Sequence, residues 1–371
     1  MQVDVDRLID ELCYTSYVMN TTNSKYSFGA NFNGFIGLNE VSGYNFGIKA
    51  ESKFLNRQNR MIEHLNSFNR SIYDFYVFLI KNKDILYETF GKLSRYYNRI
   101  HFNDVKFYNV IRSYSEKDFK DIILGFYSTF NDKYYNIAKK YFDEQRINLP
   151  SCTYDGASGN FFSLPCLESG YIFSNYYGYN SASASTIAHE LGHAIDFENF
   201  LVPQKKRLAP YSDCFLEVPS VTMAVLLKDY LRKEHIDVPG SMILDNLDMS
   251  YLRKNANIIK TNMSKNEEEI GQKIAIDFGN KQNGIKSDDA IRDGILYGVG
   301  AYFAYHLKMI RESSNEEFLK VFNNLMTLRK GIDLESAIEL TGIDKNDFVS
   351  GKYIKPQIKE NNMELKKRYK L

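Results

Sequence analysis

The pentapeptide His189-Glu190-Leu191-Gly192-His193 constrains this chain more than any other segment. Residues four apart lie on one face of an α-helix, so His189 and His193 can aim their imidazoles at a single metal ion. Glu190 stands beside the first histidine, where its carboxylate can reach a water on that metal and take its proton. The motif therefore predicts a helix that carries two zinc ligands and a general base. The alternative is two ordinary histidines on an ordinary helix.

The flanking residues favour a buried helix. The segment Ser181–Thr186 offers several candidate N-caps. Beyond it, small and aliphatic side chains recur at helical spacing, at Ile187, Leu191, Ala194 and Ile195. A helix of this kind suits a metal site that must be rigid and shielded from water.

Catalytic zinc usually takes three protein ligands and keeps a fourth position open, so a third ligand is needed. Asp196 and Asn199 occupy the positions at which a metzincin has glycine and histidine, which excludes that ligand set. Further along, Glu217 opens a segment that is otherwise apolar and predicts a second buried helix. Burying a carboxylate is costly unless a charged group pairs with it, and zinc would be that group.

Several alternatives stay open at this point. Glu217 is also compatible with a solvated acid in the first turn of a helix, favoured by the helix dipole. Asp213 competes as a ligand, although its side chain is better explained as an N-cap. Asp196 could orient a ligand histidine from behind, or could be a plain surface acid. Pro219 fits the first turn, where its missing N–H would be unpaired in any case.

Several segments carry a resemblance to a known enzyme family. From about Gly156 to Asp344 the chain resembles oligoendopeptidase F of the thimet-oligopeptidase family of zinc peptidases. The specific segments are Tyr171–Tyr176, Ser185–Ala194 and Phe215–Ser220, and the looser ones are Asp155–Phe161, Tyr297–Gly300 and Gly331–Asp344.

The resemblance implies a mainly α, multi-helix peptidase fold, to which the glycines and prolines over 150–180 add a small antiparallel β-sheet beside the zinc helix. It also implies a cleft that admits peptides, with one zinc ion at its floor. The implied ligands are His189, His193 and Glu217, which is the gluzincin pattern, with Glu190 as the base. A late helix supplies a tyrosine that donates a hydrogen bond to the oxyanion, and Tyr297 is its best positional match.

The chain departs from the family near Tyr297. The family has a histidine and a further tyrosine shortly before this position, and Asp288–Leu296 contains neither. Tyr302, Tyr305 and His306 follow soon afterwards and could substitute as the oxyanion donor. Family members are also longer, so we expect a reduced N-terminal lobe.

Composition limits the partners and the compartment. The 371 residues include 47 Lys and Arg against 46 Asp and Glu, a net charge of +1, which argues against a nucleic-acid partner. The four cysteines lack CxxC spacing and are expected to be free thiols in a reducing compartment. The N-terminus lacks the features of a signal peptide, and the apolar stretch 295–310 is too short to span a bilayer. We therefore expect a cytoplasmic protein with no membrane partner.

The pattern along the chain divides it into an N-terminal helical region (1–150), a zinc-peptidase region (151–350) and a basic tail (351–371). Hydrophobic spacing predicts a short helix over 1–14, long amphipathic helices over 51–109 and a second long helix over 116–145. Residues 15–50 lack a helical period and predict strands or an ordered loop, and glycines and prolines over 150–180 predict the small sheet.

The small sheet offers a place for substrate. An exposed strand edge can bind the backbone of an extended peptide, and Gly156 and Gly159 would allow close approach. A purely structural hairpin is equally compatible with this segment. The sequence thus predicts a zinc-dependent endopeptidase acting on oligopeptides. The alternatives are a peptide-binding zinc protein with weak or no turnover, and a protease specialised for one peptide or protein.

Overall fold

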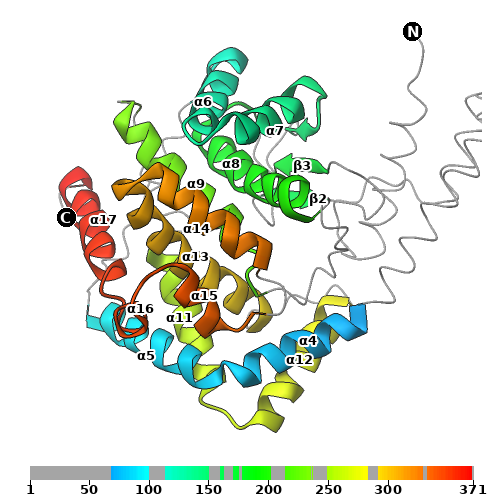
Figure 1. The fold of residues 1–371 in the computed structure, drawn as a ribbon, viewed down its shortest axis with the longest axis vertical. Helices are drawn as coiled ribbons and strands as arrows, with labels where there is room; N and C mark the ends of the chain where they lie inside the picture. The colour runs from blue at the N-terminus through cyan, green and yellow to red at the C-terminus, as the bar shows by residue number, and fades with distance from the viewer. Residues whose placement is uncertain are drawn as a thin grey trace, which may run out of the picture.

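The computed structural model describes residues 68–99, 113–149, 159–162, 170–174, 178–201, 214–234, 236, 249–282, 291–328 and 332–369. Helices dominate these residues, and the expectation of a mainly α fold is confirmed (Figure 1). The expected elements over 1–50 lie outside the described residues. In chain order the elements are α4 (Phe68–Lys81), α5 (Lys83–Arg99), α6 (Glu116–Ser128), α7 (Asp132–Asp143), β1 (Ile147–Asn148), β2 (Gly159–Phe162), β3 (Tyr171–Ser174), α8 (Ser181–Asp196), the π-helical turn η1 (Phe197–Leu201), α9 (Val218–Lys233), α11 (Met249–Met263), α12 (Glu267–Gln282), α13 (Ile291–Ser313), α14 (Asn315–Leu328), α15 (Leu334–Leu340), α16 (Lys345–Ser350) and α17 (Ile354–Tyr369).

The single helix expected over 116–145 is wrong, because α6 and α7 are separate helices. The first ends at Thr129, and the second begins after Asn131, whose backbone is extended. The Asn131 side chain accepts a hydrogen bond from the backbone N–H of Tyr134 at 2.8 Å, which is a standard N-cap. Apolar spacing continues across the break through Phe126, Phe130 and Tyr134, so periodicity alone hides it.

The sheet has three strands in the order β1-β3-β2 and lies against α8. Strands β2 and β3 are antiparallel, with Gly159 opposite Ser174 and Phe162 opposite Tyr171. Strand β1 pairs with β3 in parallel, with Ile147 opposite Ile172. The expected antiparallel sheet is therefore a mixed one. Strand β2 is at its edge.

The residue that caps the N-terminus of helix α8 lies just before the segment Ser181–Thr186, in which the cap was expected. Asn180 precedes the helix, and its side-chain oxygen accepts from the backbone N–H of Ser183 at 3.0 Å. The predicted apolar face is fully buried, at Ile187, Leu191, Ala194 and Ile195. Tyr127 of α6 fixes the middle of the helix, because its buried hydroxyl donates to the carbonyl of Ala188 at 2.7 Å.

Five helices pack in series to form the centre of the molecule. Helix α8 contacts α9, α9 contacts α13, α13 contacts α11, and α11 contacts α5. The basic C-terminal segment also joins this core: α17 lies beside α13, with Ile354 and Ile358 fully buried. The site described below is built where the first three helices of the series meet.

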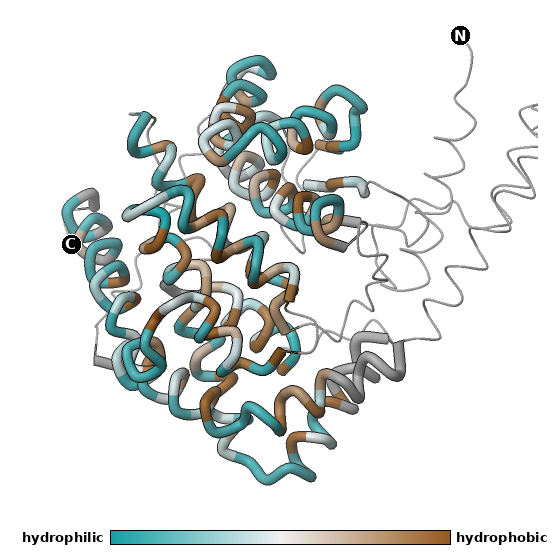
Figure 2. The backbone as a smooth tube through the Cα atoms, viewed as in Figure 1, coloured by the Kyte–Doolittle hydropathy of each residue, from teal (hydrophilic) through white to brown (hydrophobic). Residues whose placement is uncertain are grey.

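The surface pattern follows from this packing. Hydrophilic and hydrophobic residues alternate along most helices, as expected for helices with one buried face (Figure 2). Within the described ranges, no helix combines the length and apolarity needed to cross a bilayer.

His306 lies in an aromatic layer on α13. It is fully buried, and its ring stacks on Phe348 at a centroid distance of 4.4 Å. Its Nδ1 donates to the carbonyl of Tyr302 at 2.8 Å, while Nε2 has no hydrogen-bond partner among the described residues. Burial lowers the pKa of His306 to about 4, so the folded protein holds this ring neutral.

This buried ring predicts an acid-sensitive fold. An unfolded histidine titrates near pH 6.5, so the unfolded chain binds more protons than the folded protein as pH falls from about 6.5 to about 4. His306 should therefore cost about 2–3 kcal/mol of unfolding free energy by about pH 4.5. The variant His306→Phe keeps a ring against Phe348 and should lose that part of the pH dependence. Urea denaturation of the wild type and of His306→Phe, at about pH 6.5 and at about pH 4.5, measures the unfolding free energies. An identical change of unfolding free energy with pH in the two proteins would contradict this prediction.

Candidate metal centre

Helices α8 and α9 bring three predicted ligands to one point. The Oε2 atom of Glu217 lies 3.4 Å from Nε2 of His189 and 3.3 Å from Nε2 of His193. The two imidazole rings stand nearly perpendicular, with centroids 5.2 Å apart. Glu190 joins the group, since one donor atom from each of His189, Glu190 and His193 lies within 4.8 Å of the others.

Glu217 occupies the N-cap position of α9, yet its side chain makes no capping hydrogen bond. The carboxylate turns instead toward the two histidines of α8. Only 6% of Glu217 is exposed, so it is not the solvated first-turn acid considered as the alternative. Pro219 lies in the first turn, as the sequence analysis expected.

The chemistry of the donor set fits a divalent transition metal. Two imidazole nitrogens and one carboxylate oxygen are ligand types that zinc accepts. Burial raises the pKa of Glu217, but His193 and His189 outweigh it and hold that pKa well below its usual value. The carboxylate is therefore ionised, the form in which it binds a cation.

Glu190 is buried beside these groups and is 4% exposed. Burial raises its pKa to about 7, although the nearby His189 lowers it; the negative charge of Glu217 raises it further. The backbone N–H of Phe161 donates a hydrogen bond to the Glu190 carboxylate and lowers the pKa in part. Strand β2 is thus hydrogen-bonded through its backbone to the predicted base.

Two aromatic rings cover the two histidines. Phe161 of β2 stacks on His193, with centroids 6.2 Å apart and an interplanar angle of 19°. Tyr297 of α13 stacks on His189 in the same way, at 6.2 Å and 18°. Nδ1 of His189 is buried and has no hydrogen-bond partner among the described residues, so this ring is held by its stacking on Tyr297 and by the contact of its Nε2 with Glu217.

Phe161 was not among the residues predicted for the site. Its ring contact with His193 and its hydrogen bond to Glu190 both depend on β2 reaching α8, which no local pattern encodes. In the sequence, the one indication of a role for Phe161 is its position at the end of Asp155–Phe161, a segment that loosely resembles the peptidase family.

The other candidates for the oxyanion donor, Tyr302, Tyr305 and His306, are buried in the core. The Tyr302 hydroxyl donates to the backbone carbonyl of Phe348, and His306 stacks on the same residue. Tyr305 is 1% exposed. Tyr297, by contrast, stacks directly on the predicted ligand His189.

The remaining predicted residues are placed as follows. Gly159 is the first residue of the edge strand β2. Asp196 is 2% exposed, so the surface-acid alternative is wrong. Burial raises the pKa of Tyr134 on α7, and the negative charge of Asp196 raises it further. Gly156 and Asp213 lie outside the described residues.

Two glycines allow the three helices to meet at Glu217. A Cβ atom on Gly192 of α8 would lie 2.7 Å from Cα of Ser220 and 2.8 Å from the carbonyl oxygen of Pro219. A Cβ atom on Gly300 of α13 would lie 2.8 Å from the carbonyl oxygen of Glu217. The first turn of α9 is therefore held between two helix backbones, because no side chain separates them.

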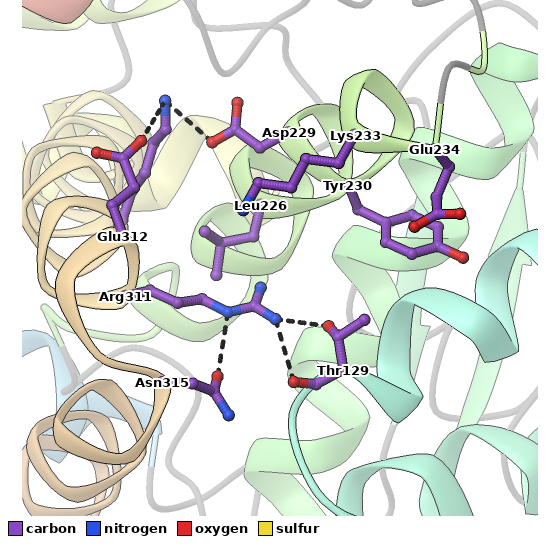
Figure 3. A pocket seen from close by; sticks show the side chains of 10 residues that line it. Thr129, Leu226, Asp229, Tyr230, Lys233, Glu234, Arg311, Glu312 and Asn315 are labelled. Carbon is purple, nitrogen blue, oxygen red and sulfur yellow. Dashed lines mark hydrogen bonds and ion pairs between the residues drawn. The ribbon is translucent and has the colours of Figure 1, made fainter.

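A cavity of about 240 Å³, lined mostly by residues with charged or polar groups, lies elsewhere, between the C-terminal half of α9 and the ends of α6 and α13 (Figure 3). Its charged groups largely satisfy one another. Lys308 pairs with Asp229 at 2.9 Å and with Glu312 at 3.3 Å, and Arg311 donates to Thr129. None of the predicted site residues lines this cavity.

Comparisons with known proteins give distant likenesses. No family model and no curated protein matches the chain. A provisionally assigned peptidase from Chlamydophila abortus is similar, with 16% identity and a TM-score of 0.47 over 97% of this chain and 66% of that one. A provisionally assigned oligoendopeptidase F from Bacillus anthracis str. Ames has 15% identity and a TM-score of 0.45 over 98% and 72%. PZ peptidase A with an inhibitor has 10% identity and a TM-score of 0.44 over 99% and 78%.

The chain thus spans about two thirds of the length of the first of these proteins. All three carry the name of a peptidase.

The close helix contact predicts a steric requirement at Gly300. Gly300→Ala would press a methyl group against the backbone of Glu217 and should cost about 1–3 kcal/mol of unfolding free energy. Gly91 of α5 is a matched control, because a Cβ there meets nothing within 4 Å. Gly91→Ala should be neutral or stabilising by up to about 1 kcal/mol. Urea denaturation compares the two; similar effects of both substitutions would show that the α9–α13 contact is not tight.

Proposed function

We propose that this chain is a zinc-dependent endopeptidase that hydrolyses oligopeptides. One observation carries the proposal: a single oxygen of Glu217 lies within 3.4 Å of two imidazole nitrogens from a different helix, beside a buried second carboxylate. A structural zinc site needs no such extra carboxylate. Glu190 therefore favours catalysis over a structural role.

His189, His193 and Glu217 would hold one zinc ion per chain. When bound, the ion supplies Lewis acidity, which polarises a carbonyl group and lowers the pKa of water to about 7. The protein contributes a rigid arrangement of these three donors, set by the packing of α8 on α9.

Glu190 acts as the general base and then as the general acid. Its carboxylate accepts a proton from the water molecule that attacks the scissile carbonyl carbon. It then gives the proton to the amide nitrogen as the C–N bond breaks, so the leaving amine departs neutral. Its hydrogen bond from the Phe161 N–H and its burial fix the carboxylate near the histidines.

Tyr297 donates a hydrogen bond to the carbonyl oxygen as negative charge develops on it. Its stacking on His189 keeps its ring beside the metal ligands. The peptide backbone would run along the outer edge of β2, where Gly159 permits close approach. This placement selects extended peptides by their backbone and leaves side-chain preference undetermined.

Two other functions stay as alternatives. The missing histidine and tyrosine before Tyr297 are compatible with a peptide-binding zinc protein that has weak or no turnover. Peptide affinity without cleavage at saturating zinc would favour it. A protease specialised for one peptide or protein would cleave that substrate far faster than a mixture of short peptides.

The first test replaces the proposed base. Glu190→Gln removes the proton acceptor, so kcat should fall by about 10²- to 10⁴-fold. It leaves all three proposed ligands in place, so the variant should retain one zinc ion per chain. Cleavage of a quenched fluorescent peptide and metal analysis of the purified proteins measure the two quantities. Glu198→Gln, which removes another carboxylate just beyond α8, should keep turnover. Wild-type cleavage by Glu190→Gln would show that a different group is the base.

The second test concerns the oxyanion donor. Tyr297→Phe keeps the ring on His189 but removes the hydroxyl, so kcat should fall by about 10²–10³ with little change in KM. Tyr302→Phe is the control, since that hydroxyl is bound to Phe348 in the core. The same peptide assay measures both variants. Should Tyr302→Phe lose more turnover than Tyr297→Phe, the assignment of Tyr297 fails.

A further inference from the structure

Ser220 touches the proposed ligand Glu217 through its side chain. It lies in the first turn of α9, three residues after Glu217, and is fully buried. Its hydroxyl Oγ is 2.7 Å from Oε2 of Glu217, and the hydroxyl is the donor because an ionised carboxylate can only accept. A hydrogen bond to a charged acceptor is stronger than one between neutral groups.

One oxygen of Glu217, Oε2, makes the contacts with Ser220 and with both histidines. Oε2 accepts from Ser220 and is also the atom 3.4 Å and 3.3 Å from the nitrogens of His189 and His193. Rotation of the carboxylate away from this arrangement would break a hydrogen bond inside a buried site, where water does not readily replace it. Ser220 therefore limits the orientations that the Glu217 side chain can take.

We propose that Ser220 is a positioning residue that holds Oε2 of Glu217 toward the two histidines and thereby raises the affinity of the chain for zinc. The inference rests on the proposed function, because it assigns Glu217 as a metal ligand. A glutamate side chain gives up considerable rotamer freedom when it is fixed. In this protein the Ser220 hydroxyl fixes the Glu217 side chain before the metal binds, so metal binding loses less conformational entropy.

A purely local role for Ser220 is the competing explanation. Serine hydroxyls in helices often bind the carbonyl one turn back, and Oγ of Ser220 is also 3.1 Å from the backbone oxygen of Glu217. Thr222 offers a matched control on the same helix. It is fully buried, and its hydroxyl donates to the Val218 carbonyl at 2.6 Å. No contact of the Thr222 side chain with the carboxylate is recorded in the described structure.

The test compares Ser220→Ala with Thr222→Val by titrating metal-free protein with zinc against a competing chelator. Ser220→Ala should weaken zinc binding about 10- to 100-fold, as typical for a residue that orients a metal ligand. Thr222→Val should stay within about twofold of wild type. Unchanged affinity in Ser220→Ala, or equal losses in both variants, overturns the proposal. Should Ser220→Ala not fold, Ser220→Gly repeats the measurement, because it also removes the hydroxyl and leaves no side-chain atom beside Gly192.

A double-mutant cycle separates positioning from general damage. Ser220→Ala introduced into Glu217→Ala should cause no further loss of zinc affinity, because the carboxylate through which it acts is gone. A further loss equal to that in wild type overturns the proposal. The absorption spectrum of Co²⁺-loaded protein should change in Ser220→Ala and not in Thr222→Val, since it reports metal geometry. A wild-type chain that binds no zinc would instead refute the proposed function itself.

Discussion

The centre of this molecule depends on the convergence of one carboxylate oxygen and two imidazole nitrogens in a buried place. Glu190 and Glu217 lie close together and are both buried. Their negative charges repel each other and have lost their hydration, so both carboxylates need partners in the protein. The histidines compensate Glu217, and the backbone N–H of Phe161 contributes to Glu190. A divalent cation among these donors would stabilise the whole group.

The helices around this group are arranged to bring it together. Glu217 reaches α8 because the first turn of α9 approaches both α8 and α13 at backbone contact distance, at Gly192 and Gly300. Buried apolar faces hold the helices in this order, from α8 through α9 to α13. The site and the core are therefore the same structure, and a substitution that widens either helix contact changes both.

The sheet and α13 each contribute one aromatic ring to the site. Phe161 on β2 covers one histidine and Tyr297 on α13 covers the other, both in nearly parallel stacks. Neither contact uses a strong directional bond, yet each restricts the rotation of an imidazole ring. Strand β2, the predicted base and the predicted ligands thus lie within one small region.

The sequence by itself determined what depends on short separations along the chain. The four-residue spacing of His189 and His193, the buried face of α8 and the position of Glu217 at the start of an apolar helix all follow from helical geometry. Continuous apolar spacing hid the break at Asn131, because a single side-chain cap interrupts a helix without altering the hydrophobic pattern. Only the tertiary structure decided that β1 pairs in parallel, that Phe161 and Tyr297 cover the histidines, and that Tyr302 and His306 belong to the core. These contacts join residues far apart in the chain, and their geometry is set by which backbones can approach each other rather than by any local spacing.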